Sequence, residues 1–99
     1  MASNLIAPSF AIFKATRDAL DAELSAATKS LKAIPGHASG PMGLTPGAVK
    51  ALPAWQAARA RVDRAFAAVR AFNGANVKRY AREIRAERDA KRERALSGE

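Results

Sequence analysis

A row of basic residues in the last quarter of the sequence offers the clearest chemistry. Lys78, Arg82, Arg85 and Arg92 stand at positions i, i+4, i+7 and i+14, so a helix would carry a cation on nearly every turn of one face. Guanidinium groups bind phosphate oxygens in pairs, and a row of them can follow a nucleic-acid backbone. The sequence therefore predicts a nucleic-acid or partner-binding surface made of Arg70, Lys78, Arg79, Tyr80, Arg82, Arg85, Arg88 and Arg92.

Two neighbours of this row add planar groups. Tyr80 and Arg79 can stack on exposed bases, as in proteins that bind single strands or RNA. Residues 78–94 also contain eight cations and four acids, so about half of the charge is neutralised locally. Contact with an acidic protein, and a solvated face without a partner, therefore remain alternatives to nucleic-acid binding.

Residues that could carry out catalysis are few. Glu83 and Glu87 stand one helical turn apart, but the surrounding arginines favour salt bridges over acid–base chemistry or metal binding. The single histidine, His37, lies in a Gly/Pro-rich segment without a partner for a serine triad or a metal, and the sequence contains no cysteine. We therefore expect no catalytic residues, no metal site and no cofactor, and predict that the protein is not an enzyme.

Composition predicts one small domain over residues 1–99 with a thin core. Hydrophobic residues make up 48% of the chain, but alanine supplies many of them and aromatic residues only 6%. A partner or a homodimer can supply the missing burial. The net charge of +8 is uneven, with +2 in residues 1–52 and +6 in residues 53–99. A basic half indicates phosphate, anionic lipid or acidic protein as a partner.

Membrane association is not expected. The N-terminal residues lack the basic lead and apolar run of a signal peptide, and no apolar stretch has the length of a membrane span. A helix lying on a membrane needs large apolar residues beside its cations, and after Ile84 only Leu96 qualifies. We expect a soluble, cytoplasmic protein.

The first half of the chain predicts one helix, from Ser9 to Ala33. Its apolar residues follow a 3–4 spacing typical of a seam between packed helices, interrupted once by Arg17, which we interpret as an edge residue. Pro8 favours the start of this helix and Pro35-Gly36 its end. The seam consists of Phe10, Phe13, Leu20, Leu24, Ala27, Leu31 and Ile34.

Residues 35–47 are rich in glycine and proline and are interpreted as a connector, because their glycines do not match a phosphate-binding loop. Thr45-Pro46 resembles a helix cap followed by proline at the first helical position, which predicts a short turn through Leu52. By the same reasoning, Pro53 begins the next helix.

The second half predicts a long amphipathic helix from Pro53 to Arg94. Its apolar register continues across Asn73-Gly74, which favours a continuous or mildly bent helix over a turn there. Such a helix would be roughly 63 Å long, more than the first helix can cover. The basic end, residues 85–99, is therefore expected to project, supported by pairs such as Glu87–Lys91. Phe72 lies off the main stripe, where it could broaden the apolar face or mark a second contact.

The predicted fold is an all-α antiparallel helical hairpin, with a long C-terminal helix (53–94) packed on helix 1 (9–33). Apolar surface left around Tyr80 and Ile84 would allow a homodimer. A helix-turn-helix module or a basic zipper does not fit, because the connector is too long and the basic region comes last. In the predicted core, Trp55, Val62, Phe66, Val69 and Val77 meet Phe10, Phe13, Leu20, Leu24 and Leu31.

Residues 43–79, GLTPGAVKALPAWQAARARVDRAFAAVRAFNGANVKR, resemble small accessory proteins of phages and conjugative elements. The resemblance implies a mobile-element protein that acts on the element's nucleic acid or on a host defence complex. Two hypotheses follow. The first is a non-catalytic nucleic-acid or nucleoprotein binder, and the second is a protein-interaction module, such as an inhibitor that docks on a host complex.

Overall fold

The computed structural model describes the backbone of residues 2–98 and the side chains of residues 10–98, and this part of the chain is helical without a strand. The all-α prediction is confirmed. The elements in order are α1 (Ala2–Lys32), a short 3-10 turn η1 (Pro41–Gly43), α2 (Gly47–Lys50), α3 (Pro53–Asn76) and α4 (Ala81–Leu96).

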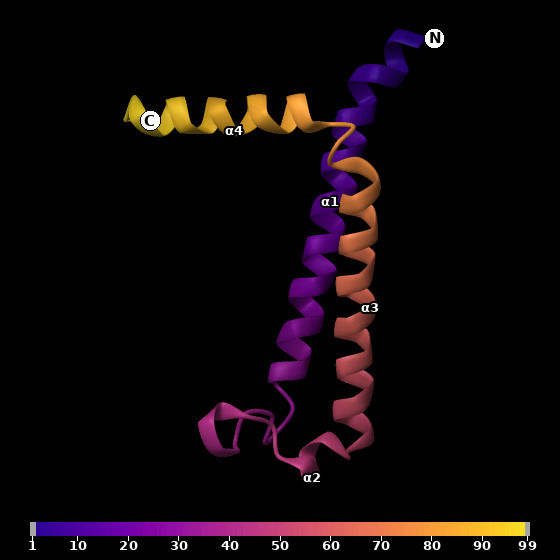
Figure 1. Cartoon of the computed structure of the whole chain (residues 1–99), viewed down its shortest axis with the longest axis vertical. Coiled ribbons are helices and arrows are strands. Elements are labelled where there is room, and N and C mark those ends of the chain that lie inside the picture. The colour runs from indigo at the N-terminus through magenta and orange to yellow at the C-terminus, as the bar shows by residue number, and fades with distance from the viewer. Residues whose placement is uncertain (1, 99) are drawn as a thin grey trace.

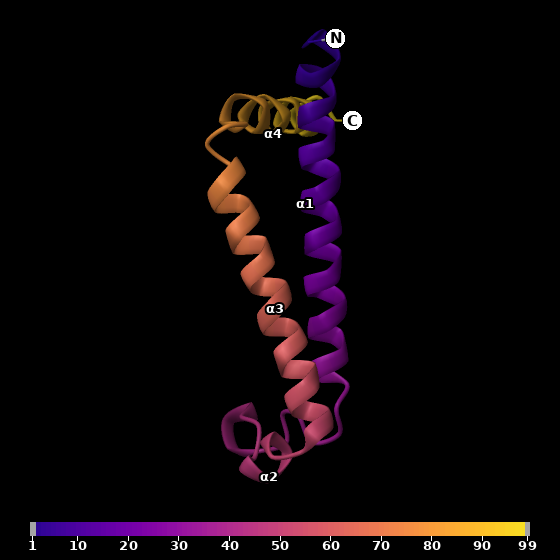
Figure 2. The same ribbon diagram turned by 90° about the vertical axis from the view of Figure 1, so that its right-hand side faces the viewer.

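Helix α1 packs on α3. The two helices lie side by side and run in opposite directions, with η1 and α2 at one end of the pair and α4 extending to one side from near the other end (Figure 1). The turned view in Figure 2 shows the same neighbours. The Cα radius of gyration is 19.0 Å, compared with about 13 Å for a compact domain of this length. The chain is therefore elongated around a narrow contact.

The core is thin and lies along the predicted seam of α1. The buried residues are Phe13, Ala27 and Leu31 of α1 and Ala65 of α3, while Arg17 is half-buried with its guanidinium 5.5 Å from the centre of the Phe13 ring. The remaining seam residues are half-buried: Phe10, Leu20, Leu24 and Ile34. The α1 seam is therefore confirmed, and Arg17 lies at its edge as predicted.

The ends of α1 differ in how well they were predicted. The helix ends at Lys32, within one residue of the prediction, and Gly36 follows with a φ of +84°. At the other end α1 begins at Ala2, so the predicted start at Ser9 is wrong. Pro8 is the seventh residue of α1, a position inside the helix where proline removes one backbone hydrogen bond at a cost of about 3 kcal/mol.

The connector folds back toward α3. The predicted cap at Thr45 is wrong, because the Thr45 hydroxyl donates to the backbone carbonyl of His37, and α2 begins after Pro46 without a side-chain cap. Trp55 Nε1 donates to Nδ1 of His37 at 3.2 Å. The first bond closes the connector on itself, and the second ties it to the first turn of α3, which begins at Pro53 as predicted.

The continuous helix predicted over residues 53–94 is wrong. Helix α3 ends at Asn76 and α4 begins at Ala81, so the break lies beyond Asn73-Gly74. Near the break, Asn76 Nδ2 donates to the carbonyl oxygen of Phe72 at 2.9 Å, a side-chain bond that competes with the helical pattern. Tyr80 has a non-helical φ and ψ of −109° and 21°, and its ring packs on Phe13. Helix α4 therefore lies crosswise to α3 (Figure 1).

The contact face of α3 is rotated from the predicted one. Ala65 and Phe72 lie against α1, and the Phe72 ring stacks on Phe13 with 5.4 Å between centroids. This face lies about 80–90° around the helix from the centre of the predicted stripe. Phe66 and Val77 are consequently 50% and 43% exposed, so their assignment to the core is wrong. The small Ala65 side chain allows close approach of the helices, which the larger Phe66 would prevent.

Replacing Gly36 by alanine is expected to destabilise the protein by about 1–2 kcal/mol, because the left-handed conformation strains any side chain. The added Cβ would also lie 2.8 Å from Cγ2 of Val49. Gly74 is a matched control, since it lies inside α3 with nothing within 4 Å, so alanine there should stabilise by up to about 1 kcal/mol. Thermal unfolding followed by circular dichroism would show shifts of opposite sign. Equal shifts would contradict this account.

Candidate nucleic-acid interface

Helix α4 carries the main cluster of predicted site residues. Arg82, Arg85, Arg88 and Arg92 are all exposed. At about 100° per residue they fall within about a third of the helix circumference, over about 15 Å of helix length. Within residues 10–98, no ion pair involves any of these four guanidinium groups. We call these four side chains the arginine face of α4.

An ion pair on the other side of α4 orients the arginine face. Nζ of Lys14 lies 2.7 Å from Oε2 of Glu87, which joins α4 to α1. The predicted Glu87–Lys91 pair is therefore wrong, because tertiary packing brings an α1 lysine closer to this carboxylate. Around the helix axis, Glu87 lies about 140–160° from Arg82, Arg85 and Arg92. The arginine face is consequently directed away from α1 toward solvent.

Two carboxylates have lowered pKa values because cations bind them. The hydrogen bond from Lys14 holds the pKa of Glu87 below its ordinary value, and the hydrogen bond from Arg61 does the same for the pKa of Glu23. Arg61 forms this bond in a bidentate manner, with Nε and Nη2 at 2.9 and 2.8 Å from the carboxylate oxygens. One pair therefore joins α1 to α4, and the other joins α1 to α3.

Acid is expected to loosen the contact between α1 and α4. Because the folded-state pKa of Glu87 is depressed, the stabilisation from its pair with Lys14 is fully present above the ordinary pKa of a glutamate, about 4.3, and is lost as pH falls through the lower folded-state pKa. The chain has no cysteine, so cysteines introduced at exposed Ala22 and Ala90 can carry spin labels. The label–label distance distribution should broaden as pH falls below the ordinary pKa of a glutamate.

Glu87→Gln should produce the same broadening at neutral pH, because a neutral amide cannot form the ion pair with Lys14. Glu83→Gln is the matched control, since Glu83 lies one turn away, is exposed and has no ion pair among residues 10–98. A distribution that is narrow and unchanged in Glu87→Gln would contradict the anchoring role of this pair.

The other predicted site residues lie apart from the arginine face. Lys78 and Arg79 are exposed in the linker between α3 and α4, so the straight ladder predicted from Lys78 to Arg92 is interrupted. Tyr80 is half-buried, with its ring centroid 4.7 Å from that of Phe13 and 5.7 Å from that of Phe10. Arg70 belongs to α3, where its guanidinium lies 5.9 Å from the centre of the Phe66 ring.

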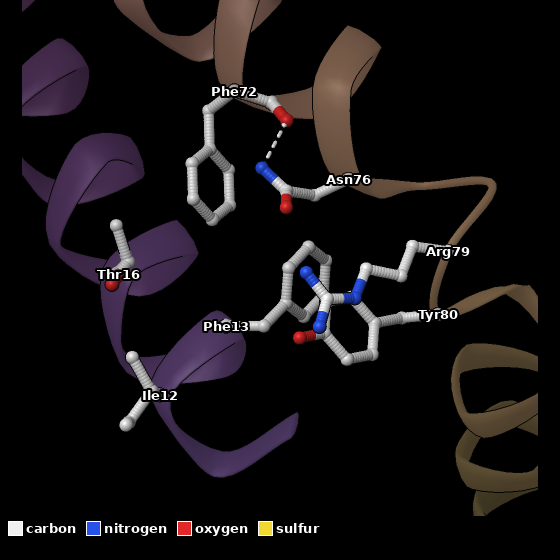
Figure 3. A pocket seen from close by; sticks show the side chains of 7 residues that line it. All are labelled: Ile12, Phe13, Thr16, Phe72, Asn76, Arg79 and Tyr80. Atoms are coloured by element: carbon white, nitrogen blue, oxygen red, sulfur yellow. Dashed lines mark hydrogen bonds between the residues drawn. The ribbon is translucent and has the colours of Figure 1, made fainter. Parts of the chain in front are cut away.

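A shallow hollow lies at the joint of α1, α3 and the linker. Its volume is about 170 Å³, and its lining side chains come from these three segments (Figure 3). The Arg79 guanidinium lies 5.3 Å from the centre of the Tyr80 ring. The lining consists of Ile12, Phe13, Thr16, Phe72, Asn76, Arg79 and Tyr80. This aromatic joint sets the direction in which α4 leaves the helix pair.

Sequence reasoning missed Ala65 and Asn76, and left the role of Phe72 open. The sequence did contain a signal for the contact face of α3. Ala58, Ala65 and Phe72 repeat every seven residues along one side of the helix, and Ala65 and Phe72 lie against α1. Nothing in the sequence pattern indicated that the Asn76 side chain would bond to the backbone.

Residues 2–98 contain no group of three or more histidine, cysteine or acidic side chains placed to hold a metal ion. Within the same range, no helix has the length and apolar character needed to cross a membrane. No family model, curated protein or solved structure matches the chain. The resemblance of residues 43–79 to accessory proteins of mobile elements therefore stays a prediction.

Proposed function

We propose that this protein is a non-catalytic binder of nucleic acid, and that α4 contacts the phosphate backbone through its arginine face. The observation that carries the proposal is the state of Arg82, Arg85, Arg88 and Arg92, which are exposed and without an ion pair among residues 10–98. Guanidinium groups in this state can bind phosphate oxygens without first breaking an internal salt bridge.

The rest of the chain supports α4 in this role. Helices α1 and α3 form a hairpin-like scaffold, and the Lys14–Glu87 pair and the Tyr80 ring hold α4 across its end. The acids Glu83 and Glu87 lie on the opposite side of α4 from Arg85 and Arg92. Asp89 falls within the arginine face and Glu93 at its edge, but neither forms an ion pair among residues 10–98. Backbone contacts of this kind carry little sequence preference. We also propose that the protein acts in the cytoplasm.

The salt dependence of binding tests the proposal. Four phosphate contacts on duplex DNA give a slope of log affinity against log salt of about −3.6, so affinity should fall about 150-fold between about 50 and 200 mM salt. Fluorescence anisotropy with labelled single-stranded DNA, duplex DNA and RNA of equal length measures this slope and compares the three ligands. A flat salt dependence for all three would overturn the proposal.

A second experiment separates nucleic-acid binding from the protein-interaction alternative. The tagged protein is purified from its host at moderate salt in two halves, one of which is treated with nuclease. Co-purifying nucleic acid that disappears on treatment, with no protein retained, supports the proposal. A defined protein partner retained in both halves would instead indicate an interaction module, such as an inhibitor that docks on a host complex.

A further inference from the structure

One edge of α3 is left uncovered by α1. It forms an apolar groove of about 450 Å³ whose centre is Phe66, 50% exposed, beside half-buried Val62. Charged side chains border the groove along its length. The lining consists of Arg59, Val62, Asp63, Phe66, Ala67 and Arg70. We call this surface the Phe66 groove.

The chain also exposes more surface than a compact monomer of its mass. Its accessible area is 7390 Å², whereas a compact monomer of 10.5 kDa has about 5,400 Å². The difference of about 2,000 Å² exceeds the roughly 800 Å² that each partner buries in a standard protein interface. One interface of ordinary size can therefore be formed from the surplus surface alone.

The charges around the groove are self-complementary. Asp63 and Arg70 lie two helical turns apart on nearly the same line of α3, with Phe66 between them. Asp63 is 62% exposed and has Arg59 of the same helix at 3.2 Å, an exposed pair of the kind that contributes little. Arg70 has no ion pair among residues 10–98. A second α3 running in the opposite direction can satisfy both groups.

We propose that the Phe66 groove is a homodimer interface, in which α3 of two copies packs antiparallel about a two-fold axis between residues 66 and 67. In this register, the numbers of two residues that face each other across the axis add up to 133. Asp63 of each copy therefore faces Arg70 of the other, and Phe66 of each copy faces Ala67 of the other, so that the two Phe66 rings are neighbours across the axis. The interface differs from the apolar surface around Tyr80 and Ile84 suggested by the sequence, because Tyr80 packs within its own chain.

The inference is independent of the proposed function, because the arginine face lies on α4 and the groove on α3. Dimerisation would place two arginine faces in one particle and raise the affinity for a long nucleic acid through a second, linked contact. Loss of dimerisation can thus be measured without any ligand. Loss of nucleic-acid binding by the arginine face can be measured on a monomer.

Sedimentation equilibrium of the full chain tests the interface. The apparent molecular mass of the wild type should approach twice the chain mass of 10.5 kDa as the protein concentration rises. Phe66→Glu should raise the dimer dissociation constant about 30-fold or more, as expected for a central aromatic anchor. Ile12→Glu is the matched control, because Ile12 is 64% exposed on α1 away from the groove, and it should leave the constant unchanged. Circular dichroism confirms that each variant remains helical.

Charge exchange gives a test that does not depend on one variant. In a homodimer of Asp63→Arg, two cations would face each other across the axis, and in a homodimer of Arg70→Asp, two carboxylates would. Each variant alone should therefore be monomeric. When the two variants are mixed, both cross-axis pairs become complementary and a one-to-one heterodimer should form. The double exchange in one chain should also restore the homodimer. A monomeric wild type, a dimer that Phe66→Glu does not weaken, or a failure of mixing to restore association would each overturn the proposal.

Discussion

Replacing Arg82, Arg85 and Arg88 together by alanine is expected to weaken nucleic-acid binding about a hundredfold at low salt. The magnitude follows from the loss of three exposed contacts of about 1 kcal/mol each. The slope of log affinity against log salt should fall by about 2–3, because three fewer counterions are released. All three side chains are exposed, and none has an ion pair among residues 10–98, so the fold should be unaffected. Fluorescence anisotropy at several salt concentrations measures both quantities.

A matched variant separates the arginine face from net charge. Replacing Lys29, Lys50 and Arg64 by alanine removes the same three charges from exposed positions outside α4. This variant should keep most of the affinity and most of the salt slope, because its cations do not lie on the arginine face. Equal losses in the two triple variants would mean that binding depends on the overall charge of +8 and not on α4.

Phe13→Ala is expected to have the largest effect on stability. Phe13 is 3% exposed, and its ring contacts those of Phe10, Phe72 and Tyr80 at centroid distances of 5.9, 5.4 and 4.7 Å. Removing a buried phenylalanine side chain costs about 3–5 kcal/mol. Since the only other buried residues in the described core are Ala27, Leu31 and Ala65, this loss is comparable to the whole stability of a small domain.

Urea unfolding followed by circular dichroism measures the loss. Ile12→Ala is the matched control, because Ile12 is the neighbouring residue on α1 and is 64% exposed, so its loss should stay within about 0.5 kcal/mol. Since the Phe13 ring also holds Tyr80, the variant should free α4 from its crosswise position before the helix pair unfolds. A Phe13→Ala protein as stable as Ile12→Ala would show that the aromatic joint does not hold the fold together.

Much of the scaffold was predictable because its signals are local. The 3–4 spacing along α1 identified the face that is buried, and Gly36 and Pro53 marked a helix end and a helix start, because their backbones restrict or permit particular φ values. The prediction of a helix cap at Thr45 is wrong, because the Thr45 hydroxyl donates to the backbone carbonyl of His37, which the folded connector brings near. The predicted start at Ser9 is wrong, because α1 runs through Pro8 although a proline inside a helix removes one backbone hydrogen bond.

The sequence by itself determined the helical class, the buried face of α1 and the collection of arginines on one side of residues 82–92. Only the tertiary structure decided where the second helix breaks, which edge of α3 meets α1, and which cation binds Glu87. Periodicity describes one helix at a time, whereas these outcomes depend on contacts between distant residues. The Lys14–Glu87 pair joins residues 73 positions apart, and it determines the direction of the arginine face.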